Sequence, residues 1–412
     1  MAMGERVDLN QLDLATPHNP AMSIYAARAL RDFGDGFAAV LLPVYLTAMG
    51  LGALEVGIVA TFALLGSALM TLGIGLLGAR VDQRTLLVAA ACLMIATGMA
   101  FAVASTYPVI LLVALMGTIN PSAGTVSVFV PLEHTVLSRS VGDGSRTKMF
   151  ARYSLIGALA AAIGALAAAS ADFLQAIGIS HLAALKVMFV FYSVLGVAGG
   201  LLYVRIPVEM PPGGEKPVAA LGPSRGIVYK MAALFSIDAF AGGFAVQSLL
   251  ALWLFSKFGL SVSAAGLFFF WSGVFAAFSF PVAAWLSRRI GLVNTMVFTH
   301  IPSSLCLILA AVAPNLEAAL VLLLVRAALS QMDVPTRSSY VMAVVTAPER
   351  PAAASITSVP RSLAAAASPA MAGALFAAGF EAWPLVICGA LKIFYDLALL
   401  WMFRHIKPPE EK

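Results

Sequence analysis

Charged residues are scarce in this sequence. Only 11% of its 412 residues are charged, whereas 61% are hydrophobic. Soluble globular proteins carry about 25% charged residues, so the composition argues against a soluble protein and predicts an integral membrane protein. The formal net charge is +5, but no basic cluster has aromatic residues interleaved with it, so we expect no nucleic acid as a partner. Basic residues also collect in the cytoplasmic loops of membrane proteins.

Motifs for catalysis and for cofactors are also missing. The three cysteines, Cys92, Cys306 and Cys388, lie inside apolar runs without the spacing of metal ligands or of a disulfide framework. The sequence contains no Walker-type phosphate loop, no HExxH helix and no GxSxG turn. We therefore expect a protein that is not an enzyme, that holds no metal or cofactor and that does not draw its energy from ATP.

Long apolar runs dominate the remainder of the chain. A bilayer core of about 30 Å is crossed by roughly 20 helical residues, and helices are expected because lipid offers no partner to an unpaired backbone group. The sequence thus predicts an all-α membrane protein with twelve transmembrane helices. They are expected at residues 22–49, 53–78, 85–105, 108–137, 149–170, 183–205, 228–256, 261–286, 292–312, 316–345, 353–379 and 383–403.

A segment rich in Pro and Gly, PVEMPPGGEKPVAALGPSRG at residues 207–226, separates six runs from the other six. Such a composition is typical of a linker. We therefore divide the chain into a six-helix bundle at 21–206 and a second one at 227–404. The tails at 1–20 and 405–412 are polar, and the first lacks the basic start and apolar core of a signal peptide.

Lysine and arginine residues predict the orientation, because they favour cytoplasmic loops. With the N-terminus inside, Lys186 and Lys257 are nearly the only basic residues at the outer edges. This asymmetry predicts that both termini lie in the cytoplasm, and we expect a monomer in the cell (inner) membrane. The basic residues on the inner side are then Arg80, Arg84, Arg139, Arg146, Lys148, Arg205, Lys216, Arg225, Arg288, Arg289, Arg350, Arg404, Lys407 and Lys412.

The two halves resemble each other. GLGALEVG at 50–57 aligns with GLSVSAAG at 259–266, an offset of 209 residues that also places Arg80 over Arg289. Further along, VPLE at 130–133 matches VPTR at 334–337. Two parallel repeats related by an axis along the membrane normal are one known architecture of secondary transporters.

Six plus six spans, a central linker and basic loops after the second and eighth spans resemble the major facilitator superfamily. The loop motif of that family reads Gly-x-Leu-x-Asp-Arg-x-Gly-Arg-Arg/Lys, and this chain keeps Gly75, Leu77, Arg80 and Arg84 but has Asp82 in place of the second Gly. Ala79 replaces the motif's Asp, and the second copy keeps Leu286, Arg289 and Gly291. The resemblance implies a transporter with a gating loop at Arg80, Asp82, Arg84 and Arg289, in which Asp82 stands in for the missing carboxylate.

Charged and strongly polar residues recur on every third span. An ionisable side chain at the bilayer centre costs about 2.5–3.5 kcal/mol on insertion scales, so such residues are expected to face water or a partner. In the family that the chain resembles, the first, fourth, seventh and tenth helices line the central cavity. On these four spans the residues are Arg28, Arg31, Asp32, Asp35; Asn120, Glu133, His134; Asp238, Gln247; and Arg326, Gln331, Asp333, Arg337.

Spacing groups these residues on helix faces. Arg28, Asp32 and Asp35 lie on one face, and Arg31 and Asp35 form a second pair four residues apart. A polar stripe of Arg326, Ser330, Asp333 and Arg337 follows the tenth span, and Lys392 with Asp396 is expected to form a structural pair on the twelfth. The alternative is that these residues form ion pairs that only fasten helices together.

These patterns predict a secondary active transporter for a small organic solute, amphiphilic or anionic, that works by alternating access. Protons are the favoured coupling ion, because a buried carboxyl group can hold a proton near neutral pH. Export is favoured because Asp35 followed by Leu42 and Pro43 resembles drug-exporting members of the family. The fifth span lacks their Gly-Pro motif, so proton-coupled uptake of a small organic anion is the alternative. We expect Asp32, Asp35, Glu133, Asp238 and Asp333 to couple protons and Arg31, Asn120, Gln247, Arg326, Gln331 and Arg337 to bind the solute.

Overall fold

The computed structural model describes residues 20–77, 81–122, 127–140, 146–208, 221–346 and 349–406. Within these ranges the chain forms α-helices joined by short connections, and no strand. The helices are α1 (Pro20–Ala48), α2 (Ala53–Leu77), α3 (Gln83–Val103), α4 (Tyr107–Met116), α5 (Phe129–Ser140), α6 (Arg146–Ala167), α7 (Ser170–Ala176), α8 (His181–Val204), α9 (Arg225–Gly243), α10 (Gln247–Phe258), α11 (Val262–Ile290), α12 (Leu292–Ala311), α13 (Leu316–Ser330), α14 (Asp333–Val344), α15 (Arg350–Ala377) and α16 (Trp383–Phe403).

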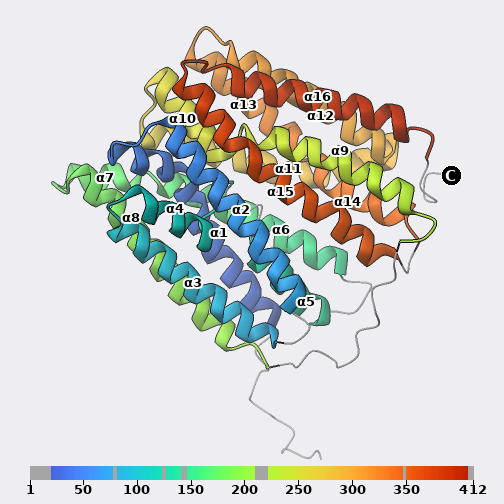
Figure 1. Ribbon diagram of the computed structural model, residues 1–412, viewed down its shortest axis with the longest axis horizontal. Coiled ribbons are helices and arrows are strands. Elements are labelled where there is room, and N and C mark those ends of the chain that lie inside the picture. Colours follow the sequence, from blue (N-terminus) through green and yellow to red (C-terminus); the bar gives the residue numbers. More distant parts are fainter. Residues whose placement is uncertain are drawn as a thin grey trace, which may run out of the picture.

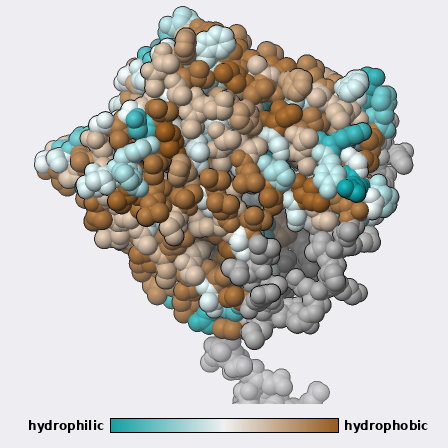
Figure 2. Space-filling view, viewed as in Figure 1, coloured by the Kyte–Doolittle hydropathy of each residue, from teal (hydrophilic) through white to brown (hydrophobic). Residues whose placement is uncertain are grey.

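Many of these helices can cross a membrane. In the described part of the chain, nine helical segments are long and apolar enough to do so, and α4 is apolar but shorter. The charged residues of α1 lower its apolar character, although at 29 residues it is long enough for a span. The predicted count of twelve is consistent with this arrangement. Large apolar side chains such as Trp401 and Val103 face outward, and apolar residues cover much of the face in Figure 2, as expected of a surface in lipid.

Three of the predicted spans are not continuous helices. The run at 108–137 is divided between α4 and α5, that at 228–256 between α9 and α10, and that at 316–345 between α13 and α14. Pro121, Pro131 and Pro335 lie in or just after two of these breaks, where a missing backbone N–H costs least. Non-helical backbone at membrane depth is tolerated where it is buried in protein or lines a cavity, so the breaks indicate where a cavity lies.

The helices form two groups along the chain. Helix α1 packs against α6 and α8, and α3 packs against α8; in the second group α9 packs against α15 and α16, and α12 against α13 and α16. Figure 1 shows α1–α8 on one side of the molecule and α9–α16 on the other. Most of the predicted linker, residues 209–220, lies outside the described residues, so the domain boundaries stay a prediction.

The two groups touch mainly at one end, which we call the closed end. There α2 meets α15 and α6 meets α11. The Thr61 hydroxyl accepts a hydrogen bond from the Ala370 amide at 3.0 Å, and the Asp172 carboxylate accepts one from the Ser263 amide at 3.0 Å. The start of α1 and the end of α16 lie at the opposite end, where Figure 1 marks the C-terminus.

Close helix contact at the closed end depends on glycine. A Cβ atom added to Gly57 would lie 2.5 Å from the Pro369 carbonyl oxygen and 2.9 Å from the Gly373 Cα. A side chain there would push α2 away from α15, because neither backbone atom can move independently.

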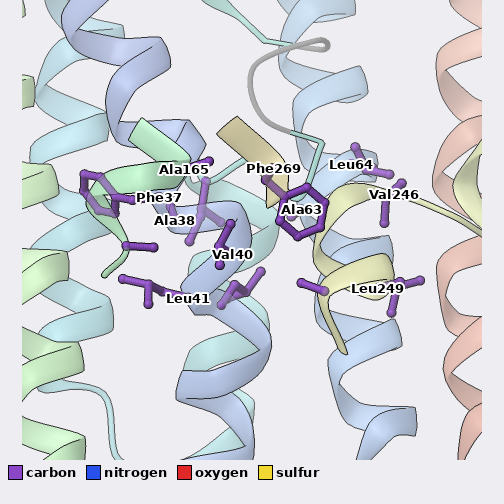
Figure 3. Close-up of a cluster of buried hydrophobic side chains, with 14 of the residues drawn as sticks. Phe37, Ala38, Val40, Leu41, Ala63, Leu64, Ala165, Val246, Leu249 and Phe269 are labelled. Carbon is purple, nitrogen blue, oxygen red and sulfur yellow. The ribbon is translucent and has the colours of Figure 1, made fainter. Parts of the chain in front are cut away.

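An apolar cluster fills the interior just below these contacts. Figure 3 shows Phe37, Ala38, Val40 and Leu41 of α1 beside residues of both groups, all of them within one continuous buried core. The side chains that meet α1 there are Ala63, Leu64, Ala165, Val246, Leu249 and Phe269. The cluster excludes water between the two groups at the closed end.

Candidate transport cavity

A partly open cavity of about 500 Å³ lies between the two groups of helices. Pockets of about 300–1,000 Å³ are typical of small-molecule sites. Leu64, Ala165, Val246 and Phe269 belong both to its lining and to the apolar cluster of Figure 3, so the closed end caps the cavity. Small residues, mostly Ala, Gly and Ser, form much of the remaining wall, and Phe269 and Phe280 are the aromatic members apart from His300 in the described chain.

Basic side chains outnumber acidic ones along this lining. Asp32, Asp238 and Asp333 are the acidic members within the described chain, and His300 adds a titratable imidazole. Five basic side chains accompany them: Arg28, Arg326, Arg337, Arg361 and Lys392. With His300 neutral, the wall therefore carries more positive than negative charge and attracts anions.

On the side of α1, the charged residues form a compact cluster, of which Arg28 and Asp32 reach the cavity wall. Arg31 Nη1 lies 3.0 Å from Glu133 Oε2, and Arg31 Nη2 lies 3.3 Å from Asp32 Oδ1. Arg28 Nε lies 2.6 Å from Asp32 Oδ2. Arg31 is 3% exposed and Glu133 is fully buried. We call Arg28, Arg31, Asp32 and Glu133, with the tyrosines that bond to them, the N-side network.

Tyrosines complete this network. The hydroxyls of Tyr153 and Tyr203 both donate to Glu133, the latter at 2.5 Å, and Tyr153 also accepts from Arg28 at 3.1 Å. Each charged group therefore has a partner of opposite charge, and Glu133 has two hydroxyl donors as well. Such pairing makes a buried charge tolerable in a membrane.

The predicted pair of Arg31 and Asp35 does not form. Arg31 is held by Glu133 and Asp32 instead, and Asp35 accepts from the Tyr192 hydroxyl at 3.0 Å. Among the described residues Asp35 has no ion-pair partner. Neither Arg31, Asp35 nor Glu133 lines the cavity, because the first two point into α5 and α8 rather than across the molecule.

Of the three amide side chains predicted to bind the solute, two line the cavity and one does not. The side chain of Asn120 is 3% exposed, and its Oδ1 accepts from the Ser122 amide at 2.8 Å in the break between α4 and α5. It does not line the cavity, whereas Gln247 and Gln331 do, at the two breaks of the second group.

On the other side, charged residues of four helices form what we call the C-side network. Asp238 on α9 accepts from Arg337 on α14 at 3.1 Å and from Lys392 on α16 at 2.6 Å. Arg337 also donates to Asp333 at 2.9 Å. Unlike the N-side network, most of this network lines the cavity: Asp238, His300, Asp333, Arg337 and Lys392.

The prediction that Lys392 pairs with Asp396 is wrong. Lys392 reaches α9 and bonds to Asp238, while both carboxylate oxygens of Asp396 lie 3.0 Å from Nδ1 of His300 on α12. The Lys392 ammonium and the Asp396 carboxylate both point toward neighbouring helices rather than toward each other, because the partners there lie in the interior, closer than the residue one turn away on α16.

His300 was missed by reading the sequence, since the expected charged spans were the first, fourth, seventh and tenth. It is buried, yet it contributes to the cavity wall. The signal was present in its own helix, because Ser303 and Ser304 follow His300 by three and four residues and form a polar face with it on a mostly apolar α12. All three line the cavity.

Two arginines on the cavity wall lack an acidic partner. The side chains of Arg326 on α13 and Arg361 on α15 make no hydrogen bond or ion pair with the described residues, and the buried Nε of Arg361 has no acceptor. In the interior of a membrane protein, an arginine without a counter-charge is costly. These two side chains therefore have unused capacity to bind an anion.

The predicted gating loop is placed only in part. Arg80 lies outside the described residues. Asp82 begins α3 as its N-cap, and its carboxylate accepts from the Thr85 amide at 3.0 Å. Arg289 lies over the Trp285 ring with its guanidinium 4.6 Å from the ring centre, and Arg84 is half-buried. The gating role of these residues stays a prediction.

Comparisons with known proteins agree with this architecture. Residues 232–412 match the model of the Major Facilitator Superfamily. A protein of Saccharomyces cerevisiae described as an uncharacterized membrane protein is 20% identical over 416 residues, which span 92% of this chain and 93% of that protein.

Solved structures share the fold along nearly the whole chain. A bacterial homologue of the human lysosomal transporter Spinster, in an inward-facing and occupied conformation, superimposes with a TM-score of 0.72 at 16% identity, over 93% of this chain and 96% of that one. The nucleoside transporter NupG gives a TM-score of 0.71 at 15% identity, over 94% of this chain and 100% of that one. The resemblance to the major facilitator superfamily that the sequence predicts is thus confirmed: residues 232–412 match the model of that family, and the fold along the chain is shared with the two solved transporters.

Proposed function

We propose that this chain is a secondary active transporter that moves a small organic anion, by alternating access and together with protons. The observation that carries the proposal is the pair Arg326 and Arg361, two basic side chains on the cavity wall without an acidic partner in the described chain. Export of an amphiphilic or anionic solute, favoured by the sequence, gives way here to the alternative that the sequence left open, proton-coupled uptake of a small organic anion.

An anion would complete what the protein leaves incomplete. A guanidinium binds a carboxylate or phosphate through two parallel hydrogen bonds, and a hydrogen bond to a charged group contributes about 1.5–3 kcal/mol. A cation would have to displace Arg337 or Lys392 from the carboxylates that they already hold. The wall therefore favours a negative solute over a positive one.

The shape of the cavity supports a small solute. Its volume of about 500 Å³ and its lining of Ala, Gly and Ser leave room for a compact molecule but few aromatic faces for a large apolar one. The breaks before α10 and α14 also place backbone groups at the wall, beside Gln247 and Gln331. Half-helix ends at membrane depth are a recurrent way to bind solutes in secondary transporters.

The closed end supports alternating access. The two groups of helices touch there through small residues and few polar contacts, and the cavity lies on the other side of the apolar cluster. Opening these contacts while closing the opposite end would expose the same cavity to the other side of the membrane. A monomer in the cell membrane, with both termini in the cytoplasm, is part of the proposal.

Among the carboxylates expected to couple protons, Asp32, Asp238 and Asp333 line the cavity. Each is bound by at least one basic side chain, so a solute anion that attracts the basic partner would leave its carboxylate free to take a proton. Anion and proton would then bind together, which describes symport.

Proton-driven export is the second candidate. It is favoured by Asp35, the acidic residue of the pattern that resembles exporters, because this buried carboxylate has a tyrosine hydroxyl and no ion-pair partner among the described residues.

The test starts with binding and ends with flux. Purified protein is screened by thermal shift against lactate, benzoate, succinate and citrate, with the corresponding neutral amides as controls. The strongest binder is then offered to proteoliposomes across an imposed pH step of either sign. We expect carboxylates but not amides to stabilise the protein, and accumulation on the alkaline side. Stabilisation by amides or organic cations alone would contradict an anionic solute, and accumulation on the acidic side would favour export by exchange.

A further inference from the structure

We propose that His300 is a proton-binding residue of the transport cycle and that Asp396 is the positioning residue that holds its imidazole in one tautomer. The proposal rests on the proposed function and names the side chain through which protons and anion are coupled. It concerns α12 and α16, which were not expected to contribute to the cavity.

The geometry assigns different tasks to the two ring nitrogens of His300. Nδ1 lies 3.0 Å from both carboxylate oxygens of Asp396, which is fully buried and can only accept. Nδ1 therefore carries the ring proton. Nε2 lies 3.3 Å from Nζ of Lys392, and because an ammonium group only donates, Nε2 is the acceptor of a neutral ring.

Nε2 is also the atom that can take a further proton. His300 belongs to the cavity wall, so a proton can reach it through water in the cavity. Once Nε2 carries a proton it can no longer accept from Lys392, and the imidazolium repels the ammonium. Asp238 Oδ1, at 4.0 Å from Nε2, is the nearest acceptor for the new N–H.

This exchange links proton binding to the solute. Asp238 now holds Lys392 at 2.6 Å. If the imidazolium donates a hydrogen bond to Asp238, the ion pair between Asp238 and Lys392 weakens. The Lys392 ammonium then becomes available to an anion in the cavity that it already lines. The bound proton also adds one positive charge to the wall. Proton and anion therefore favour each other's binding, and by linkage the coupling is reciprocal.

The charged and titratable groups around His300 are compatible with this exchange of partners on protonation. Asp396, Lys392 and Tyr395 of α16 face His300, with the Tyr395 ring 6.1 Å from the imidazole between centres. On α9 the group that faces His300 is Asp238, and the basic residues of α11, Arg288 and Arg289, lie in the last turn of that helix. The remaining groups of the elements around it are Arg326, Asp333 and Arg337 of α13 and α14 and Arg361 of α15. His300 therefore has the fully buried Asp396 at Nδ1 as a constant partner. At Nε2 it has Lys392, which it would lose on protonation.

The first test reads the tautomer directly. The protein, which has five histidines, is labelled with ¹⁵N-histidine, and the His300 ring signals are identified by their loss in His300→Gln. We expect a neutral ring protonated at Nδ1 at high pH, conversion to the doubly protonated ring as pH falls, and a mixture of neutral tautomers in Asp396→Leu. A neutral ring protonated at Nε2, or a ring that stays neutral down to pH 5, would overturn the proposal.

The second test reads the charge of the cavity and needs no identified solute. Ser330 on the cavity wall is changed to Cys after Cys92, Cys306 and Cys388 have been changed to Ser. The rates of an anionic sulfonatoethyl and a cationic trimethylammonioethyl methanethiosulfonate are then compared as a ratio, divided by the same ratio for a free thiol in solution, which cancels the reactivities of the thiol and of the two reagents. We expect the anion-to-cation ratio to rise at least threefold from pH 8 to pH 5.5, and to stay flat when His300→Gln is added.

The outcomes of the second test separate the two proposals. A ratio below one at every pH would contradict the anionic solute of the proposed function. A ratio above one whose pH dependence is the same with and without the His300→Gln substitution would leave the proposed function intact and overturn the role of His300. Expression and thermal stability of His300→Gln are measured alongside, and His300→Asn is the second variant if the first does not fold.

Discussion

The two charged networks of this molecule differ in what their side chains have left to bind. In the N-side network, Arg31 and Glu133 are enclosed by each other, by Asp32 and by two tyrosine hydroxyls, away from the cavity. In the C-side network, the ion pairs lie on the cavity wall, beside Arg326 and Arg361, which form no ion pair with the described residues. Saturated charges fix helices in place, whereas unsaturated charges on a wall can recognise a solute. We therefore propose that the N-side network mainly supports the helices and that the C-side network binds the solute.

The largest loss of stability is expected from removing the charge of Arg31. Arg31→Met leaves Glu133 in the interior without its cation, and breaking a buried ion pair in this way costs about 3–5 kcal/mol. We expect a large fall of the melting temperature in detergent and little folded protein by size exclusion. The matched variant Arg326→Met, which leaves no acid unpaired, should melt close to the wild type. Equal losses in the two variants would refute the assignment.

The reverse effect is expected for binding. Arg326→Met removes a charged hydrogen-bond donor worth about 1.5–3 kcal/mol, so the affinity for the carboxylate found in the thermal-shift screen should fall about 10- to 100-fold by isothermal titration. Arg361→Met should act in the same direction. Asp35→Asn, on the N side, should leave affinity within twofold. Unchanged affinity in both arginine variants would mean that the solute does not use the unpaired cations.

The closed end joins the two groups of helices, and a bulky residue at Gly57 should open it. The Cβ of Gly57→Leu would clash with Pro369 and Gly373, and overpacking of this kind costs about 1–3 kcal/mol. Spin labels replacing the exposed Ile177 and Val312 are expected to report longer distances by pulsed electron resonance. Gly199→Ala, where an added Cβ meets nothing within 4 Å, is the control and should leave the distances unchanged.

The smallest effect is expected at the far end of the second group, outside the spans. Hydrogen bonds from Thr346 and Ser224, followed by that from the Gly222 amide, lower the pKa of Glu349 from 4.5 to about 2. Between these values the unfolded chain binds a proton that the folded protein does not, so stability is full above about pH 4.5 and falls as pH decreases. Between pH 7 and pH 3, the melting temperature of Glu349→Gln should fall less than that of the wild type. Glu317→Gln is the control.

Much of this architecture could be predicted from the sequence because lipid restricts the choice. Runs of about 20 apolar residues must be helices, and the ends of α1, α2 and α16 lie within two residues of those expected. The breaks at 244–246 and 331–332 could not be placed, since they depend on the packing of other helices. Gly243, for example, tolerates no Cβ because Ala365 and Ser368 approach it across α15.

The site was predicted unevenly for a related reason. Spacing along one helix identified Arg28 with Asp32 and Asp333 with Arg337, which do pair. The same spacing failed for Arg31 with Asp35 and for Lys392 with Asp396, because partners on other helices compete and their positions are tertiary information. His300 was overlooked because a single histidine in an apolar helix looks like packing until Asp396 is placed beside it.

The most direct test of the account is the charge selectivity of the cavity wall toward small reagents, in protein whose native cysteines have been removed. Ser330→Cys on the cavity wall is compared with Ser193→Cys, whose buried hydroxyl donates to the Ile95 carbonyl in the N half. The account predicts that, with each rate divided by that of the same reagent with a free thiol, the anionic methanethiosulfonate modifies the Ser330→Cys protein at least several-fold faster than the cationic one at pH 7, while the Ser193→Cys protein resists both. Faster reaction of the Ser330→Cys protein with the cation, or equal reactivity at the two positions, would contradict it.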